Sequence, residues 1–385
     1  MNERTPFWKT VPATSRAVGL LGVFLLFSTI GFSNDVIQLG REPVLVLVLA
    51  VLLYGGFAVA YAAAGTVFEQ QRWKAIALIF IVQMVAMNLV YRLIPVPPPP
   101  AQMGAADIAR VSERLGVSAY ANIAAMVLGY VCFVYVSITE GRRYFRAHAE
   151  IELASEIHRT LVPAIDIKTS GFEFYGRSIP SGKVGGDLID VFQDERGWIA
   201  YVADVSGHGV APGVVMGMVK SAARMRLSCS DQSVGLLESL NSVLYSVTRP
   251  EMFVTFAYLA SNGRQLDCSL AGHPAILHYH AATKEITEIS CSNLPLGMFD
   301  GQQFASDSVE YAGNDLFLML TDGLLEVENA NGEEFGVAAV KAIVLEHAAD
   351  SVNTIFQALV TAAQRHGHAT DDQSLLIVHS RASSS

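Results

Sequence analysis

Long apolar segments separated by short polar breaks fill the chain up to about residue 140, and mixed composition follows. A membrane-spanning helix needs about 20 mostly apolar residues. Four segments approach that length, namely residues 17–33, 43–64, 75–91 and 118–139. The first and third are short for a span. The pattern therefore predicts a transmembrane helical region over residues 1–139, followed by a part of the chain that lies in water.

Basic residues indicate the orientation of these spans, because Lys and Arg collect on the cytoplasmic side. They stand before the first span, between the second and third, and after the fourth: Arg4, Lys9, Arg16, Arg72, Lys74, Arg142, Arg143 and Arg146. Arg92, Arg110 and Arg114 dilute the bias, but the opposite arrangement would export the basic group beside the last span. We therefore expect a multi-pass protein of the inner (plasma) membrane whose C-terminal part lies in the cytoplasm.

Two features of the membrane region allow a second reading. The first span could be a signal peptide, although no clear small-residue cleavage site follows it, and the C-terminal part would be cytoplasmic in either case. The proline-rich connection within residues 95–117 is typical of a stiff spacer, and a sensory loop is the alternative. No carboxylate pair or buried charge is visible inside the predicted spans, so anchoring or sensing is favoured over transport.

Residues 140–163 predict an amphipathic linker helix that continues from the last span. Ile151, Ala154, Ile157, His158 and Leu161 recur at steps of three and four residues, which is the period of one helix face. Such a stripe could pair with a second copy of the chain in a homodimer. Packing of the helix on its own domain explains the stripe equally well.

Hairpins and helices alternate after the linker. Residues 188–193 and 198–204 are expected as strands around a turn at residues 194–197, and the Asn262-Gly263 pair predicts a second hairpin. Helices are expected over residues 210–227, 236–247, 337–347 and 352–365, and further strands over residues 172–179, 253–260, 265–270, 275–280, 316–321 and 374–378. Hairpins mixed with helices favour an α+β layered fold over a parallel βαβ array.

Aspartates stand at the ends of several of these expected strands. They are Asp187, Asp204, Asp322, Asp371 and Asp372. A charged group at the end of a buried strand is costly unless it is paired or bound to a cation. Oxygen ligands without a His or Cys cluster suit a hard cation such as Mg²⁺ or Mn²⁺. An ordinary turn explains any one Asp-Gly pair, but several such sites on separate strands predict a metal centre if the sheet brings them together.

The motifs occur in an order that resembles the SpoIIE/RsbU-type branch of the metal-dependent PPM protein phosphatases. They are Glu152-Leu153 through Leu161-Val162-Pro163, Gly185-Gly186-Asp187 with Asp190, Asp204-Val205-Ser206-Gly207-His208-Gly209, Ala271-Gly272-His273-Pro274, Thr321-Asp322-Gly323 and Asp371-Asp372. Each motif alone is weak, but the series is specific. The resemblance covers about residues 151–378 and implies an α-β-β-α sandwich over residues 164–385, with two Mn²⁺ or Mg²⁺ ions at one edge.

The resemblance also assigns roles to single residues. Asp187 and Asp204 would be shared by the two metals, Val205 would supply a backbone carbonyl, and Asp322 and Asp371 would complete the ligands. Asp372, Gly186 and Asp190 would support these ligands from outside. Two divalent ions lower the pKa of a bound water and neutralise phosphoryl charge, so the implied hydrolase needs no protein nucleophile.

His208 is a candidate for the acid that protonates the leaving serine oxygen, because an imidazole titrates near neutral pH. In the wider phosphatase class the proposed acid lies two residues after the aspartate, whereas His208 lies four after Asp204. The spacing therefore favours a role in shaping the loop.

Three other functions were considered. Gly185-Gly186-Asp187 also opens the signature of diguanylate cyclases, but Leu188 and Ile189 replace the expected Glu and Phe. A histidine kinase is disfavoured because no glycine-rich nucleotide box follows the linker helix. A non-catalytic membrane receptor that binds a partner through a phosphatase-like domain is the remaining alternative. Against it, every acidic metal position is intact.

The formal net charge of −10 argues against nucleic acid as a partner, since phosphate-backbone contacts need clustered Lys and Arg. The expected partner is a phosphoserine or phosphothreonine protein. The resemblance implies a phosphorylated anti-sigma-factor antagonist of the STAS type, and therefore a role in bacterial signal transduction and sigma-factor regulation. The input signal and the physiological metal are left open by the sequence.

Overall fold

The computed structural model describes most of the chain. The described residues are 11–67, 71–98, 104–169, 171–207, 209–229, 235–248, 251–261 and 265–381. They divide into two compact units, unit 1 over residues 1–147 and unit 2 over residues 148–385. Each unit is described by itself. His208 and the expected hairpin turn at Asn262-Gly263 lie outside the described residues.

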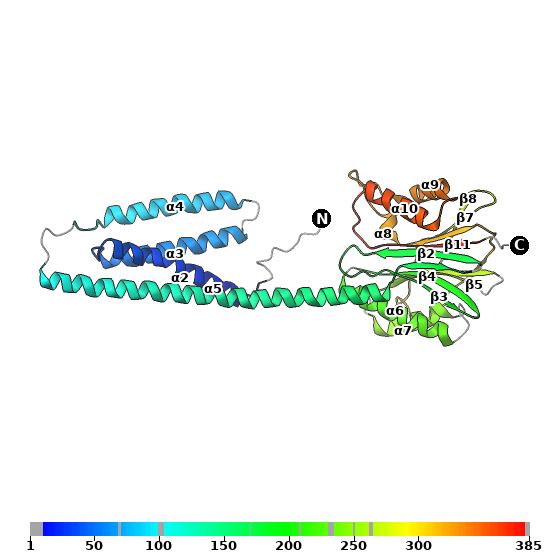
Figure 1. The fold of residues 1–385 in the computed structure, drawn as a ribbon, viewed down its shortest axis with the longest axis horizontal. Helices are drawn as coiled ribbons and strands as arrows, with labels where there is room; N and C mark the ends of the chain where they lie inside the picture. Colours follow the sequence, from blue (N-terminus) through cyan, green and yellow to red (C-terminus); the bar gives the residue numbers. More distant parts are fainter. Residues whose placement is uncertain are drawn as a thin grey trace. The chain divides into compact units, whose positions relative to one another are not determined.

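Unit 1 contains four long helices (Figure 1): α2 (Ala13–Ile37), α3 (Val44–Val67), α4 (Arg72–Leu93) and the first part of α5 (Ala105–Leu161). All four are long and apolar enough to cross a membrane. The sequence pattern predicted short apolar segments for the first and third spans. The helices that contain them, α2 and α4, are 25 and 22 residues long. A helix of that length spans the hydrocarbon core of a bilayer at 1.5 Å per residue.

The helix α5 differs from the expected arrangement. It begins at Ala105, inside the region predicted as a connection, and it runs without a break through the predicted span and linker to Leu161. The polar residues 105–117 interrupt the apolar pattern, but they contain no glycine or proline before Gly116 that would stop a helix. One continuous helix therefore joins the two units of the chain.

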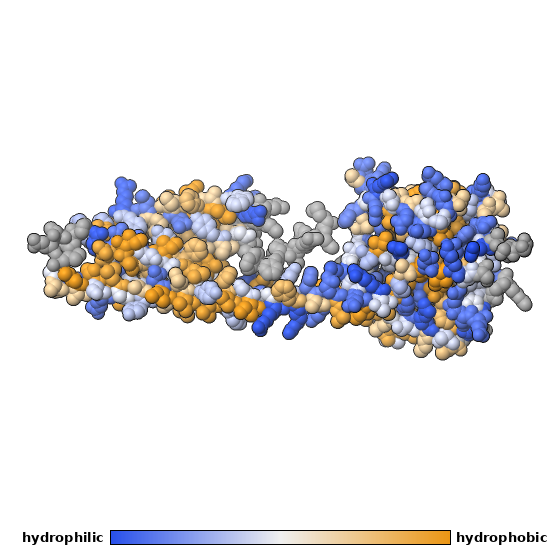
Figure 2. All heavy atoms as spheres, in the orientation of Figure 1, coloured by the Kyte–Doolittle hydropathy of each residue, from blue (hydrophilic) through white to orange (hydrophobic). Residues whose placement is uncertain are grey.

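Side chains on unit 1 suit an apolar surrounding. Apolar residues gather over its helices in Figure 2. Large apolar side chains along α4 and α5 are exposed, including Leu78, Phe80, Met126 and Phe133. Such a surface is too apolar for water and is what lipid-facing helices present. These observations allow four membrane spans.

Unit 2 is built on two antiparallel sheets. One sheet has the order β1-β2-β11-β10-β7-β8 and the other β3-β4-β5-β6-β9. Their strands are β1 (Ile165–Lys168), β2 (Phe172–Ile179), β3 (Leu188–Asp194), β4 (Gly197–Val205), β5 (Val254–Ser261), β6 (Leu266–Ala271), β7 (Ile276–His280), β8 (Glu285–Ile289), β9 (Asp307–Val309), β10 (Leu316–Leu320) and β11 (Gln373–Ser380). The two sheets pack face to face.

Helices cover both outer faces of this sandwich (Figure 1). They are α6 (Val210–Cys229) and α7 (Leu236–Val247) on the β3-β4 side, and α9 (Gly336–His347) and α10 (Val352–His366) on the β10-β11 side. A short helix, α8 (Asp322–Leu325), follows β10. The arrangement confirms the α+β class and the α-β-β-α sandwich that the sequence predicted.

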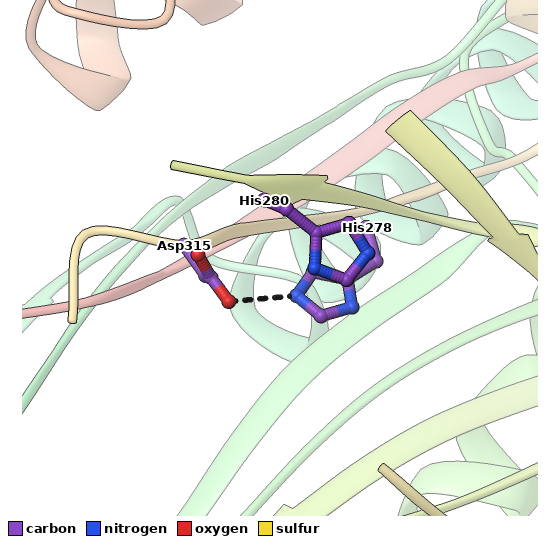
Figure 3. A group of neighbouring side chains, drawn as sticks. All are labelled: His278, His280 and Asp315. Atoms are coloured by element: carbon purple, nitrogen blue, oxygen red, sulfur yellow. Dashed lines mark hydrogen bonds and ion pairs between the residues drawn. The ribbon is translucent and has the colours of Figure 1, made fainter. Parts of the chain in front are cut away.

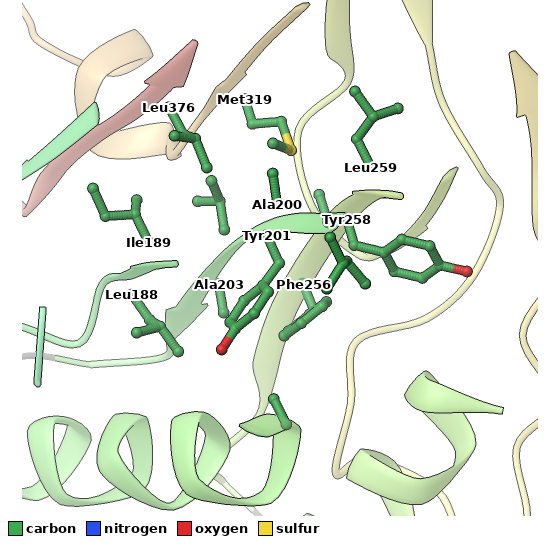
Figure 4. Packing of buried hydrophobic residues seen from close by; sticks show 14 of the residues in the cluster. Leu188, Ile189, Ala200, Tyr201, Ala203, Phe256, Tyr258, Leu259, Met319 and Leu376 are labelled. Carbon is green, nitrogen blue, oxygen red and sulfur yellow. The ribbon is translucent and has the colours of Figure 1, made fainter. Parts of the chain in front are cut away.

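Alternation along the central strands decides which side chains face the other sheet. In Figure 4, Ile189 and Ala200 point toward Met319 and Leu376 of the facing sheet, whereas Tyr201 points toward the helices. All five residues are buried. Strand side chains alternate with period two. Successive side chains along β3 therefore point in turn toward the other sheet and toward the helices. This alternation later determines where the aspartates point.

Four elements were not expected from the sequence. Strands β8 and β9 consist mostly of exposed or half-buried residues, and β1 has only four residues. Short strands at or near a sheet edge carry little hydrophobic pattern, because only one face touches the core. The single turn α8 is too short for a helical period. Tertiary pairing, not local pattern, creates all four elements.

Replacing Phe174 with Ala should lower the free energy of unfolding of unit 2 by about 3–5 kcal/mol, because it leaves a cavity in a closely packed core. The Phe174 ring is fully buried. It packs edge to face against the ring of Trp198, which belongs to the other sheet, with 4.9 Å between the ring centroids. Urea unfolding of a fragment that begins at Glu140 measures the change. Phe299→Ala, at a side chain 54% exposed, should change it by less than about 0.5 kcal/mol.

Candidate metal centre

The hairpin of β3 and β4 brings the first two predicted ligands together. Leu188 pairs with Ala203, so Asp187 and Asp204 are the next residues beyond this pair and face one another. Both lie one step from residues that point toward the helices, so their side chains point into the sheet interface. Asp187 is buried and Asp204 is half-buried. Besides burial, the charge of Asp204 raises the pKa of Asp187, as expected for two neighbouring carboxyl groups.

The ends of β10 and β11 supply the other residues of the site. Leu320 pairs with Leu375, and the backbone N–H of Thr321 donates to the carbonyl of Ser374 at 3.1 Å. Asp322 therefore stands just beyond the pair, opposite the chain that carries Asp371 and Asp372. The β3-β4 hairpin and the β10-β11 strand pair, which belong to different sheets, thus end at the same edge of the sandwich.

Thr321 connects the β10-β11 strand pair to the β3-β4 hairpin. Its Oγ1 donates to Asp187 Oδ2 at 2.9 Å and accepts the backbone N–H of Ser374 at 3.0 Å. All three groups are buried. In the sequence, Thr321 stands out only as part of the Thr321-Asp322-Gly323 motif. Its hydroxyl, next to a predicted ligand, is the one local signal of a role in supporting Asp187.

The carboxyl groups at this edge raise one another's pKa values. Burial and then the Asp204 charge raise the pKa of Asp187 well above its ordinary value. Burial and then the Asp322 charge raise the pKa of Asp204 to about 7. Burial and the Asp371 charge also raise the pKa of Asp322. The charges acting on these three groups come mainly from other aspartates, so the site holds more negative charge than unit 2 neutralises.

Asp372 holds the glycine loop before β3. Its Oδ2 accepts the backbone N–H of Gly186 at 2.7 Å, and its Oδ1 accepts the backbone N–H of Ser181 at 2.7 Å. A Cβ atom on Gly186 would lie 2.8 Å from the Val205 carbonyl oxygen. Glycine at this position therefore lets the loop approach the end of β4 closely. Ser181 was not identified from the sequence, because a serine in a loop carries no distinctive pattern.

Asp190 points away from the other aspartates. It lies three residues after Asp187, so alternation turns its side chain toward α6. Arg224 donates to both Asp190 oxygens at 2.6 Å, and Tyr201 donates to Oδ2 at 2.6 Å. Burial alone would raise the pKa of Asp190, but the hydrogen bonds from Arg224 and Tyr201 outweigh it and lower the pKa. Asp190 therefore anchors α6 against β3 and β4.

The donor set fits a hard divalent cation. Asp187, Asp204, Asp322 and Asp371 offer carboxylate oxygens, and the end of β4 offers the Val205 carbonyl. The pKa values of Asp187, Asp204 and Asp322 are raised by burial and by neighbouring carboxyl groups. Such carboxylates are stabilised when a cation joins them. Among the described residues, these aspartates do not form a group of three with ligand atoms within 4.8 Å of one another.

A different group does meet that distance, His278, His280 and Asp315 (Figure 3). It lies at the other end of β10 from the aspartates. Asp315 Oδ2 meets His278 Nε2 at 3.0 Å, and the backbone N–H groups of Ala281 and Ala312 donate to the Asp315 carboxylate. These bonds fasten the loop before β10 to β7. They leave Asp315 little capacity to bind an ion.

Removing the Thr321 hydroxyl should weaken both the fold and metal binding. Thr321→Val would leave the Ser374 N–H and one Asp187 oxygen without their partner, at a cost of about 1–3 kcal/mol. Urea unfolding and calorimetric Mn²⁺ titration of the fragment from Glu140 measure the two effects. Thr321→Ser keeps the hydroxyl, and Thr160→Val changes an exposed threonine. Equal Mn²⁺ affinity in Thr321→Val and Thr321→Ser would contradict the supporting role of this hydroxyl.

His273 should make unit 2 less stable in acid. Burial lowers the pKa of His273 to about 4, whereas an unfolded histidine titrates near 6.5. The unfolded chain therefore binds more protons between these values, and stability falls as the pH drops from about 6.5 to about 4. His273→Asn, whose amide can still donate to the Pro274 carbonyl, should lose this part of the pH dependence. Thermal unfolding across that pH range tests the prediction, and parallel curves for both proteins would refute it.

Comparisons with known proteins agree with the fold of unit 2. Residues 194–381 match the family model for Stage II sporulation protein E (SpoIIE). Two proteins of Bacillus subtilis (strain 168) are similar to part of the chain. The phosphoserine phosphatase RsbU is 23% identical over 48% of this chain and 56% of its own length. The phosphoserine phosphatase RsbP is 24% identical over 46% of this chain and 45% of its own length. The chain thus spans about half the length of these relatives.

Solved structures show the same fold. The SiaA-PP2C domain of Pseudomonas aeruginosa matches with a TM-score of 0.54 at 18% identity, covering 62% of this chain and 98% of the domain. The RsbU and RsbW domains of a Mycobacterium tuberculosis protein match with a TM-score of 0.50 at 24% identity, over 57% of this chain and 62% of that one. By sequence, residues 194–381 are similar to the SpoIIE family and part of the chain is similar to the RsbU and RsbP phosphatases, and by fold unit 2 is similar to the SiaA-PP2C domain.

Proposed function

We propose that unit 2 is a metal-dependent protein serine/threonine phosphatase and that unit 1 anchors it in the plasma membrane. The observation that carries the proposal is the meeting of Asp187, Asp204, Asp322 and Asp371 at one edge of the sandwich, where the first three have raised pKa values. Unpaired carboxylates of this kind are stabilised by hard cations. The fold is that of enzymes that act on phosphoproteins.

Two Mn²⁺ or Mg²⁺ ions are the proposed cofactors. Asp187 and Asp204 would be shared between them, and Val205 would contribute its backbone carbonyl. Asp322 and Asp371 would complete the ligands, while Asp372 holds Gly186 in place. When bound, a pair of divalent ions supplies an activated water and offsets the charge of a phosphoryl group.

The residues of the chain keep this edge ready for the reaction. Thr321 fixes the orientation of the Asp187 carboxylate through its hydroxyl. Asp371 is exposed and accepts the backbone N–H of Asp372 at 2.8 Å, so the open side of the site faces solvent. A phosphorylated side chain on another protein can reach an exposed edge of this kind, whereas a deep pocket would exclude it. His208, with its spacing of four from Asp204, is proposed to shape the neighbouring loop.

The proposed substrate is a phosphoserine or phosphothreonine of a bacterial signalling protein. The relatives RsbU and RsbP are named phosphoserine phosphatases, and one similar structure joins an RsbU domain to an RsbW domain. These names support a role in sigma-factor regulation. A phosphorylated anti-sigma-factor antagonist of the STAS type is the specific substrate that we propose.

The proposed topology places unit 2 in the cytoplasm. Arg72 and Lys74 at the start of α4 and the basic residues 142–146 of α5 would lie on the same side of the membrane. In unit 2, Ile151 and Ile157 of α5 are 38% and 52% exposed, whereas His158 is buried. The exposed apolar residues support a homodimer in which α5 pairs with α5 of a second copy.

Asp322→Asn should abolish Mn²⁺-dependent release of phosphate from a phosphoserine protein or an aryl phosphate. We expect a loss of more than about 100-fold, because even residues that only support metal ligands cost 10–100-fold when changed. The assay uses the fragment from Glu140 with and without Mn²⁺. Asp300→Asn, at an exposed aspartate, is the matched control and should keep full activity.

The outcome also separates the enzyme from a binding-only receptor. Metal-dependent turnover that Asp322→Asn removes would establish the phosphatase. A folded full-length protein in lipid that binds Mn²⁺ but releases no phosphate from any phosphoprotein would instead favour a non-catalytic domain.

A further inference from the structure

Charged and polar side chains gather at one end of unit 1, where α2 joins α3 and α4 leads into α5. The sequence pattern showed no carboxylate pair inside the predicted spans, and the structure places two carboxyl groups just outside them. Helix α2 continues to Ile37, past the predicted end at residue 33, and so contains Asp35. Asp35 and Glu42, which lies just before α3, both have a relative exposure of 0%.

Asp35 has a complete set of partners. Arg114 of α5 forms an ion pair with its Oδ1 at 2.8 Å, and the Ser118 hydroxyl donates to its Oδ2 at 2.6 Å. Both partners lie on α5, one turn apart. An ionised aspartate in an apolar surrounding is stabilised only when it is paired in this way. Asp35 therefore fastens α2 to α5 as a carboxylate.

Glu42, unlike Asp35, lacks a hydrogen-bond partner for one of its two carboxylate oxygens within the described part of the chain. Its Oε1 accepts from the Asn34 amide at 2.5 Å and lies 3.4 Å from the Tyr91 hydroxyl. Its Oε2 is buried and has no hydrogen-bond partner among the described residues. Arg114 donates a hydrogen bond to the backbone carbonyl of Glu42, but its ion pair is with Asp35. The Glu42 carboxylate is thus the charge that this end of the bundle leaves unmatched.

We propose that Glu42 is a proton-binding site at the end of unit 1 that lies away from the continuation of α5 into unit 2. The single guanidinium of Arg114 is paired with Asp35, so one proton added to Glu42 makes the group of two carboxylates and one guanidinium neutral. Neutral polar neighbours donate to only one of the two Glu42 oxygens. No cavity is needed for a proton, and this suits a carboxylate that is packed on all sides.

The surroundings of Glu42 determine the sign of the effect. The facing groups are Asn34 and Asp35 of α2, Tyr91 of α4 and Arg114 of α5, and Tyr54 of α3 lies near Tyr91. Burial and then the Asp35 charge raise the pKa of Glu42. The folded protein therefore holds this proton more tightly than the unfolded chain. Unit 1 should lose stability as the pH rises through the raised pKa.

Loss of the proton would act on α5. An ionised Glu42 competes with Asp35 for Arg114, and Arg114 and Ser118 are the residues by which α2 holds α5. Helix α5 continues without a break to Leu161. Proton binding at Glu42 is therefore coupled to the helix that links the two units. This inference concerns unit 1 and does not depend on the phosphatase activity of unit 2.

A hydrophobic carbodiimide tests the proposal on the unaltered full-length protein in lipid bilayers, because this reagent attacks carboxyl groups that carry a proton in apolar surroundings. We expect a modified peptide that contains Glu42, with labelling that falls as the pH is raised. Asp35, which is paired with Arg114, and Glu113, which is exposed on α5, should remain unlabelled. Labelling of Asp35 in place of Glu42, or labelling of Glu42 that does not change with pH, would overturn the proposal.

Infrared spectra of the protein in lipid provide a second test. Wild type and the control Glu113→Gln should show a protonated carboxyl band that disappears as the pH rises, and Glu42→Gln should lack it. Both variants keep the aspartates of unit 2. Subtracting the Glu113→Gln spectrum from the Glu42→Gln spectrum therefore removes the contribution of those aspartates. Identical spectra for Glu42→Gln and Glu113→Gln would refute proton binding at Glu42. If Glu42→Gln does not fold, the carbodiimide result on the unaltered protein decides.

Discussion

Repulsion among carboxylates at one edge of the sandwich is the constraint on which the functional part of the structure depends. The β3-β4 hairpin places Asp187 opposite Asp204, and the β10-β11 pair ends beside them with Asp322 and Asp371. Such a cluster is costly without a cation. The fold tolerates it because the hairpin and the strand pair are each held by a core that does not involve the aspartates.

Other polar bonds hold these aspartates in position. Thr321 orients Asp187, Asp372 holds the loop at Gly186, and Asp190 binds Arg224 of α6. Each bond joins segments that are distant along the chain. The site is therefore a property of the whole sandwich, and a change in the packing of α6 would reach β3 through Asp190. Strongly shifted carboxyl groups beside well-paired ones are typical of functional sites.

Unit 1 shows the same contrast on a smaller scale. Asp35 has both oxygens satisfied, whereas Glu42 has one oxygen without a donor. In both units, the fully bonded carboxylate has a structural role, and the incompletely bonded one is the candidate for binding a ligand or a proton. The physical reason is that a buried charge without partners can be stabilised only by something added to it.

The sequence by itself determined the features that depend on local pattern. Apolar length predicted the four long helices, alternation and turn residues predicted most strands, and the positions of Asp187, Asp204 and Asp322 at strand ends predicted a common metal centre. Only the tertiary structure decided that Asp190 faces α6, that Thr321 contacts Asp187, and that Asp35 and Glu42 lie together. The Asp190–Arg224 and Thr321–Asp187 bonds join residues 34 and 134 positions apart. Their partners are chosen by strand register and helix packing, which no local pattern records.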